Sequence, residues 1–406
     1  MTTEKDGLPL NRFRPVLIIS LVLMALGVTV FLMQAAGAHP ARAWQAYLIN
    51  FLLFSAIAQG GFLFSTVMHL TGARWSRSMA GVAEAFAGFF PVSFVLFLLL
   101  FFGREHLFPW LHADLHGKEI WLNLPFLMTR NAVGLFLLYG FGFAYLYYAL
   151  GVKRDAGMSP ACAPEFLHPV AGDSQRRRAR MTFFGILYTL SFAVVLSLLG
   201  YDLVMSLDPH WYSTLFGAYT FVKAFYVGLA GIIILAALLK LTGSTPLDLQ
   251  AAHFHDVGKL FFGFCLVWAD FFYCQLVVIW YGNIPEESAY VIERVVASPY
   301  NPLAWGVFLA GFVLPFFILL NRNIKTRPVA MIVLCTVVLV SIWLEHLLLV
   351  GPALFPHGTA LPLGISDGVI SLGFLGLMVL AITSFLNRFP ELVLPDPVPG
   401  IKKEGH

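Results

Sequence analysis

Ionisable side chains embedded in long apolar stretches are the residues of this sequence most able to do chemistry. An ionisable group in hydrocarbon is costly unless it is paired, and such groups commonly relay protons or bind ligands. The candidates for a proton path are His69, Glu84, Asp202, Lys223, Asp256, Lys259, Asp270, Glu345, His346 and Asp367. Acids, imidazoles and amines of this kind pass protons, and the sequence assigns none of them to bond-making catalysis.

Several of these candidates have a structural alternative. Asp256 and Lys259 are three residues apart, so they could form an ion pair on one helix face or take up protons. Glu84 lies near the start of its apolar stretch, where a helix N-terminus favours a carboxylate, and this structural interpretation is the simpler one. Asp270 lies far from either end of its stretch, so it must be protonated or paired with Lys223 or another polar group. For Asp270 we therefore favour a function.

Glu345, His346 and Asp367 lie toward the opposite end of the apolar stretches. Glu345 and His346 are adjacent and so point about 100° apart on a helix, while Asp367 opens the last stretch. Two carboxylates and an imidazole could accept protons from a quinol and pass them outward. They could equally form a structural cap beneath the loop that contains Pro352 and Pro356.

A further polar group is typical of a quinone site. A quinone head needs an apolar slot with a few convergent polar side chains. The candidates are Arg130, Asn131 and Asp202, with His210 and Trp211 nearby. Our hypothesis places this slot at the outer ends of the first group of helices.

The sequence predicts no ligated or covalently bound redox cofactor. Its 4 cysteines form no C-x-x-C and stand at no metal-ligand spacing from histidine, which excludes a zinc or iron–sulfur site. His69 and His346 approach opposite membrane faces, so they cannot together ligate a haem. Only a quinone, either menaquinone or ubiquinone, and lipids are expected as bound groups.

The composition indicates that lipid is part of the solvent. Of 406 residues, 59% are hydrophobic and only 12% are charged, too few to cover a water-soluble globule of this size. The net charge of +3 is small and its basic residues lie in short loops, which excludes nucleic acid as a partner.

About ten apolar stretches are long enough to cross a bilayer as helices. The predicted spans are 15–37, 46–70, 80–103, 124–150, 183–205, 214–241, 256–281, 302–321, 327–351 and 364–387. Most of the 25 Lys and Arg residues lie on the side of the N-terminus, a positive-inside bias that predicts both termini in the cytoplasm.

A short repeat suggests how the spans are grouped. The second span ends in His69-Leu-Thr-Gly72 and the sixth in Lys240-Leu-Thr-Gly243, four helices later and so in the same orientation. This predicts an all-α integral membrane fold of two parallel four-helix bundles, spans 2–5 and 6–9, with peripheral first and last helices. The corresponding segments are 1–45, 46–205, 206–351 and 352–406.

Three longer stretches carry a resemblance to a known family. They are SLDPHWYSTLFGAY (206–219), HDVGKLFFGF (255–264) and IWYGNIPEES (279–288), supported by Arg74-Trp75 and by LFPW (107–110). With them the chain resembles the NrfD/PsrC-type membrane subunits of polysulfide reductases, and within these the ActF-type subunit of alternative complex III, a quinol:electron-acceptor oxidoreductase.

The resemblance implies a place in a multisubunit complex of the bacterial inner membrane. The implied partners are a periplasmic iron–sulfur subunit, multihaem cytochrome c subunits and a homologous membrane subunit, with quinol as substrate. In such complexes the homologous subunit is the expected seat of quinol oxidation, while this type is expected to carry protons and hold the complex together.

Three functions therefore compete. The first is a structural and proton-conducting subunit of a quinol-oxidising respiratory or photosynthetic complex, part of an oxidoreductase without redox cofactors of its own. The second is a quinone-binding membrane subunit of a related periplasmic oxidoreductase. The third is a secondary transporter, because ten spans, a repeat and buried charges are also typical of that class.

Overall fold

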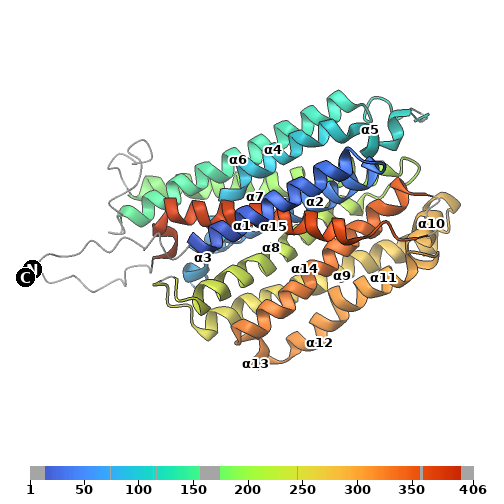
Figure 1. Ribbon diagram of the computed structural model, residues 1–406. Coiled ribbons are helices and arrows are strands. Elements are labelled where there is room, and N and C mark those ends of the chain that lie inside the picture. Colours follow the sequence, from blue (N-terminus) through green and yellow to red (C-terminus); the bar gives the residue numbers. More distant parts are fainter. Residues whose placement is uncertain are drawn as a thin grey trace, which may run out of the picture.

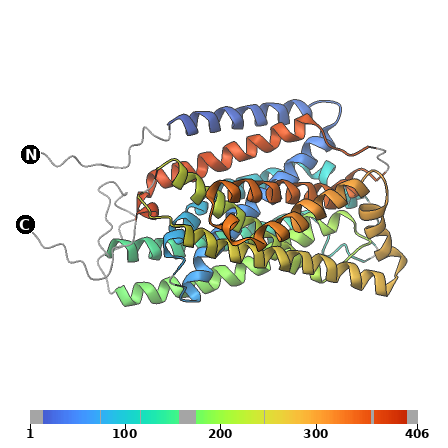
Figure 2. The same ribbon diagram turned by 90° about the horizontal axis from the view of Figure 1, so that it is seen from below.

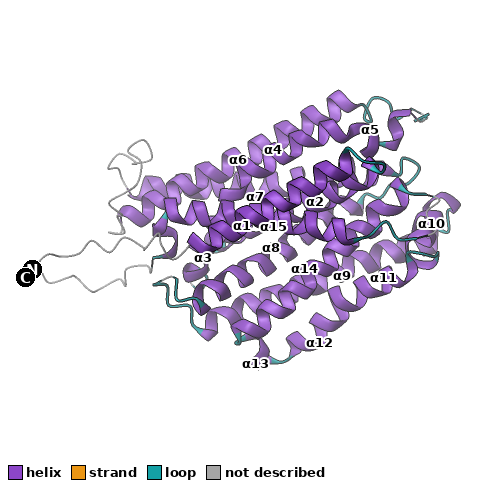
Figure 3. Ribbon diagram, viewed as in Figure 1, coloured by secondary structure: helices purple, strands orange, loops and turns teal. Residues whose placement is uncertain are grey.

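Helices account for the regular structure of this chain. The computed structural model describes residues 14–73, 75–112, 114–115, 117–155, 174–244, 246–356 and 360–394, and no strand occurs among them (Figure 3). Ten helical segments in these ranges are long and apolar enough to cross a membrane. The predicted all-α membrane architecture is thereby confirmed. A helix satisfies its own backbone N–H and C=O groups, which hydrocarbon requires.

The first bundle contains four spans. They are α2 (Pro40–Leu70), a composite span from α3 (Arg77–Glu84) through η2 (Ala85–Phe89), α4 (Phe90–Leu99) and η3 (Leu100–Gly103) to α5 (Arg104–Leu107), then α6 (Leu124–Asp155) and α7 (Ser174–Leu203). Helix α7 begins before the predicted start at residue 183, because its first turns carry basic residues that hydropathy does not count as membrane. Arg74 and most of the loop at 151–182 lie outside the described residues.

The second bundle also contains four spans. They are α8 (Leu215–Leu241), α9 (Ala251–Gly282), a composite of α11 (Asn301–Phe308), the π-helical turn η8 (Leu309–Val313) and α12 (Leu314–Leu320), and α14 (Pro328–Leu354). The short helices α10 (Pro285–Val291) and α13 (Arg322–Lys325) lie at opposite ends of this bundle, and α5 lies at the same end as α10 (Figure 1).

Helices α1 (Arg14–Ala35) and α15 (Ile365–Arg388) form a peripheral pair. They lie side by side on one flank of the molecule (Figure 2). Glycines allow the contact, since a Cβ on Gly373 would lie 2.7 Å from the Cα of Gly27. After α15, the short helix η9 (Pro390–Val393) turns back under α3.

The two bundles meet where α2 crosses α8. A Cβ on Gly60 would lie 1.9 Å from the carbonyl oxygen of Ala224, and a Cβ on Gly228 would lie 2.2 Å from the carbonyl carbon of Gly60. Small residues let helix backbones approach this closely in membranes, where packing rather than hydrophobicity drives association. Helix α2 is the most enclosed span, and its polar residues are therefore held away from lipid.

Replacing Gly60 by alanine is expected to destabilise the contact between the bundles. The added methyl group meets backbone atoms, which cannot rotate away, so overpacking of about 1–3 kcal/mol follows. Thermal unfolding of the purified protein in mild detergent, followed by size-exclusion chromatography, measures the loss. Gly140→Ala is the matched control, because a Cβ at Gly140 meets nothing within 4 Å. Equal stability of the two variants would contradict this account of the crossing.

Candidate functional site

Glu84 joins three spans at the end of the first bundle where α2 ends and α3 begins. Its carboxylate accepts a hydrogen bond from the Ser65 hydroxyl at 2.8 Å and one from the Lys153 ammonium at 3.0 Å. The Tyr145 hydroxyl lies 3.1 Å from that of Ser65. Because α3 begins at Arg77, Glu84 lies about two turns inside the helix, beyond the reach of its N-terminus. The charge of Glu84 is neutralised by Lys153 instead.

The other candidates for a proton path at this end are His69, Asp256 and Lys259, and each interacts with a nearby side chain. The Nε2 atom of His69 lies 3.0 Å from the Thr182 hydroxyl of α7. Asp256 and Lys259 form the ion pair that their spacing allows, at 2.7 Å on the first turns of α9. His346, on α14, lies toward the opposite end, so His69 and His346 do not share a depth.

A second polar cluster lies near the middle of the first bundle, and the sequence interpretation missed it. The Gln59 amide donates to the Tyr139 hydroxyl at 2.7 Å, and Tyr139 donates to the Ser93 hydroxyl at 2.8 Å. Ser93 lies 2.6 Å from the hydroxyl of Ser55, and all four side chains are buried. Ser55 and Gln59 are one turn apart on α2, a spacing that could have revealed them.

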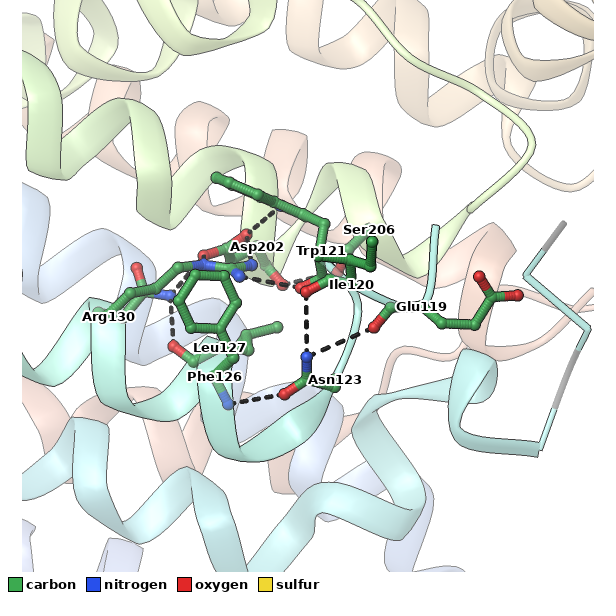
Figure 4. A network of polar contacts seen from close by, with 10 residues as sticks. Glu119, Ile120, Trp121, Asn123, Phe126, Leu127, Arg130, Asp202 and Ser206 are labelled. Carbon is green, nitrogen blue, oxygen red and sulfur yellow. Dashed lines mark hydrogen bonds and ion pairs between the residues drawn. The ribbon is translucent and has the colours of Figure 1, made fainter. Parts of the chain in front are cut away.

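Asp202 holds the first bundle together at the end where α6 begins and α7 ends (Figure 4). The guanidinium of Arg130 donates to both of its oxygens, at 2.7 and 2.5 Å, and the Asn131 amide donates at 2.6 Å. The Trp121 indole adds a bond of 3.2 Å, and its ring lies 4.0 Å from the guanidinium carbon. The predicted quinone-pocket residues Arg130, Asn131 and Asp202 thus converge, but they bond one another.

The remaining two residues of that hypothesis lie in the loop before α8. His210 is exposed. Trp211 is buried and stacks on Tyr290, with ring centroids 3.7 Å apart, while the guanidinium carbon of Arg294 lies 3.4 Å from the centroid of the Tyr290 ring. Burial raises the pKa of Tyr290 to about 12, so the phenol stays neutral in this three-layer stack. The stack joins the 206–219 loop to the segment after α9.

Lys223 and Glu345 form a fully buried ion pair in the second bundle. The Lys223 ammonium lies 3.1 Å from Oε1 of Glu345, and the Tyr219 hydroxyl donates to the same oxygen. The other oxygen, Oε2, has no hydrogen-bond partner among the described residues. His346 lies next in the chain, and its Nδ1 bonds the Ile342 carbonyl at 2.8 Å. The carboxylate of Glu345 is therefore only half satisfied.

Two cavities border this pair. A cavity of about 20 Å³ lies between the bundles and is lined by Ser55, Thr220, Lys223 and His346 among apolar residues. This is room for one water molecule. A much larger cavity of about 770 Å³ opens between α9, α11 and α14, and the carboxylates among its lining residues are those of Glu345 and Asp270.

The structure gives Asp270 and Asp367 different surroundings from Glu345. Asp270 is exposed on α9, where the Cys274 thiol lies 3.8 Å from it, whereas Lys223 pairs with Glu345. Asp367 accepts from Arg42 of α2 at 3.0 Å and from the backbone N–H that precedes α15. Asp367 therefore caps α15 and ties it to α2.

An ion pair that the sequence interpretation missed lies beneath the first bundle. Arg154, at the end of α6, lies 2.7 Å from Glu391 of η9, and the Glu391 side chain is fully buried. The sequence analysis did not single out this segment, whose short helix carries Pro390 in its first turn, where proline is favoured.

The fold and its buried ionisable side chains define a polytopic integral membrane protein. Comparison of the chain with models of known protein families and with curated proteins finds no match. In the described ranges, no group of three or more His, Cys, Asp or Glu side chains is placed to hold a metal ion.

The Arg130–Asp202 pair is expected to act structurally. Arg130→Met leaves a carboxylate buried without its cation and should lower the free energy of unfolding by about 3–5 kcal/mol, whereas Arg130→Met with Asp202→Leu should recover most of that loss. Thermal unfolding in detergent measures both variants. If the double variant is stable but loses binding of a quinone-site inhibitor, the pair lines a quinone pocket instead.

Proposed function

We propose that the chain is an integral membrane subunit of a quinol-oxidising electron-transfer complex of the alternative complex III type, in which it conducts protons. The observation that carries this proposal is the water-sized cavity between Ser55 and the Lys223–His346 side of the second bundle. It joins the buried polar groups of one bundle to those of the other. Partners named by the sequence resemblance would carry the electrons.

The path has an ordered set of steps along α2. Ser65, bonded to Glu84, lies near the end of α2, whereas Ser55 lies at its midpoint. Lys223 lies about 12 Å from the start of α8 at the helical rise, in the other half of the membrane. Protons would therefore move from Glu84 through the Gln59–Ser55 cluster to the pair of Lys223 with Glu345.

One aromatic residue separates the first two steps. Phe62 packs between the clusters, with its ring centroid 5.8 Å from that of Tyr145 and 4.9 Å from that of Tyr188. The Tyr188 hydroxyl donates to the backbone carbonyl of Gln59 at 3.0 Å rather than to a side chain of either cluster. A proton would cross here only when a side chain or water moves, which suits a controlled path rather than an open pore.

Glu84→Gln is expected to slow proton transfer while the complex still assembles. Lys153 is partly exposed at the helix end, so its ammonium can reach water when its partner is neutral. We expect quinol-driven proton release from proteoliposomes of the purified complex to fall at least about tenfold, since a relay loses its titrating group.

The control for this experiment is Glu105→Gln. Glu105 is an exposed carboxylate paired with His112 in a loop helix, away from the path. Assembly is checked by the subunit composition of the purified complex. Proton release that is equal in Glu84→Gln, Glu105→Gln and the unchanged protein would refute the path. Isolation of the chain alone, moving a solute, would favour the transporter hypothesis.

A further inference from the structure

Asp270 is a carboxylate that the packing of the spans leaves exposed. Its Oδ1 atom lies 3.8 Å from the Cys274 thiol, one turn further along α9, and no cation pairs with it among the described residues. Five other carboxylates pair with a cation from another helix. Helix α9 is also one of the least enclosed of the ten spans, so much of its surface has no neighbour within this chain.

Asp270 lies at mid-membrane depth. Toward one end of α9, Trp280 and Tyr281 are 74% and 80% exposed, as aromatic side chains at the boundary between lipid and water are. Toward the other end, the ion pair of Lys259 with Asp256 marks the opposite polar boundary. At the helical rise, Asp270 lies about 15 Å from Trp280 and about 16 Å from Lys259, and a hydrocarbon core is about 30 Å thick. No lipid headgroup can therefore neutralise this carboxylate.

Two hollows adjoin along α9 beside this residue. One is the cavity of about 770 Å³ between α9, α11 and α14, which Asp270 lines, and the other is a hollow of about 410 Å³ between α9 and α10. Both are lined by Tyr273 and Leu276, so together they follow α9 from Leu266 to Trp280, about 21 Å at the helical rise. An elongated apolar groove of this kind receives the apolar face of a helix.

The charge of Asp270 decides what the groove receives. None of the described residues that line the two hollows is a lysine or an arginine, so the counter-charge comes with the occupant. A lipid acyl chain has no hydrogen-bond donor. A second copy that packs by this face about a two-fold axis brings another unpaired carboxylate instead of a cation, and like charges repel. A helix with a basic side chain at the same depth meets both requirements.

We propose that this groove docks a transmembrane helix of a partner subunit, with a lysine or arginine of that helix paired to Asp270. The pair fixes the register of the two helices, because a shift of one turn would move the charges about 5.4 Å apart. Exposed aromatic side chains beside the groove, Tyr273 of α9 and Trp305 of α11, supply apolar contact around it. The inference goes beyond the proposed function, since it depends on the depth and exposure of Asp270 and not on proton transfer.

The partner is captured by a photoreactive side chain placed in the groove. Tyr273 is replaced by p-benzoylphenylalanine in the full-length chain, native membranes are illuminated, and the attached peptide is identified by mass spectrometry. We expect a membrane-spanning segment of another polypeptide that carries a lysine or arginine within about one turn of the attached residue. The same replacement of Leu190, which is exposed on α7 of the first bundle, is the control and should not attach that segment.

Three results of this experiment would overturn the proposal. They are attachment to a second copy of this chain, attachment to phospholipid alone, and attachment to a segment that has no basic residue at that depth. The first would make the groove a self-association surface, and the second would leave Asp270 facing lipid.

The ion pair is tested by removing it and then reversing it. Asp270→Leu should lower the amount of the partner in the purified complex at least about tenfold, because the basic side chain loses its counter-charge in hydrocarbon. Since Asp270 is exposed, leucine fits without repacking this chain. Asp270→Lys, combined with aspartate at the partner's basic position, should restore the partner to the level of the unchanged complex.

Asp256→Asn is the matched control for the ion pair. It removes the other aspartate of α9, which pairs with Lys259 near the start of the helix, and this variant should retain the partner in full. Full retention of the partner in Asp270→Leu, or no recovery in the reversed pair, would show that Asp270 does not hold a partner helix.

Discussion

A charge at membrane depth must be neutralised within the protein, and much of this structure follows from that constraint. In hydrocarbon an unpaired carboxylate or ammonium costs several kcal/mol, and five carboxylates of the described residues accordingly pair with a cation from another helix. These partners are far apart in the chain, and the pairs therefore fix which helices touch and at what depth. The pairs are Glu84–Lys153, Asp202–Arg130, Glu345–Lys223, Asp367–Arg42 and Glu391–Arg154.

Close packing makes this pairing possible. The glycines at the α2–α8 crossing bring two backbones within contact distance, which places Ser55 of one bundle and Lys223 of the other on the same small cavity. Bulkier residues at Gly60 and Gly228 would move the two helices apart. Ser55 and Lys223 would then no longer line the same cavity. The polar connection between the bundles thus depends on an apolar contact.

The ten spans could be predicted from the sequence because hydropathy measures transfer into hydrocarbon, and length sets how many residues cross it. Hydropathy does not fix how a helix is rotated. Asp270 and Lys223 lie at depths that allow a pair, yet α9 turns Asp270 to its exposed side and Lys223 meets Glu345. Tyr139 was missed for another reason: tyrosine is counted with the hydrophobic residues of the composition, and that count ignores its hydroxyl.

Asp202 and Glu345 are both buried and paired with a cation, but their carboxylates differ in how they are hydrogen-bonded. Asp202 receives four hydrogen bonds spread over both oxygens, so any ligand would have to displace one of them. Glu345 receives its two bonds on a single oxygen, which leaves the second without a donor among the described residues. Asp202 and Glu345 are both buried carboxylates with a cationic partner, so burial and charge do not separate the two residues. The two carboxylates differ in unmatched hydrogen-bonding capacity, which Glu345 retains at Oε2 among the described residues.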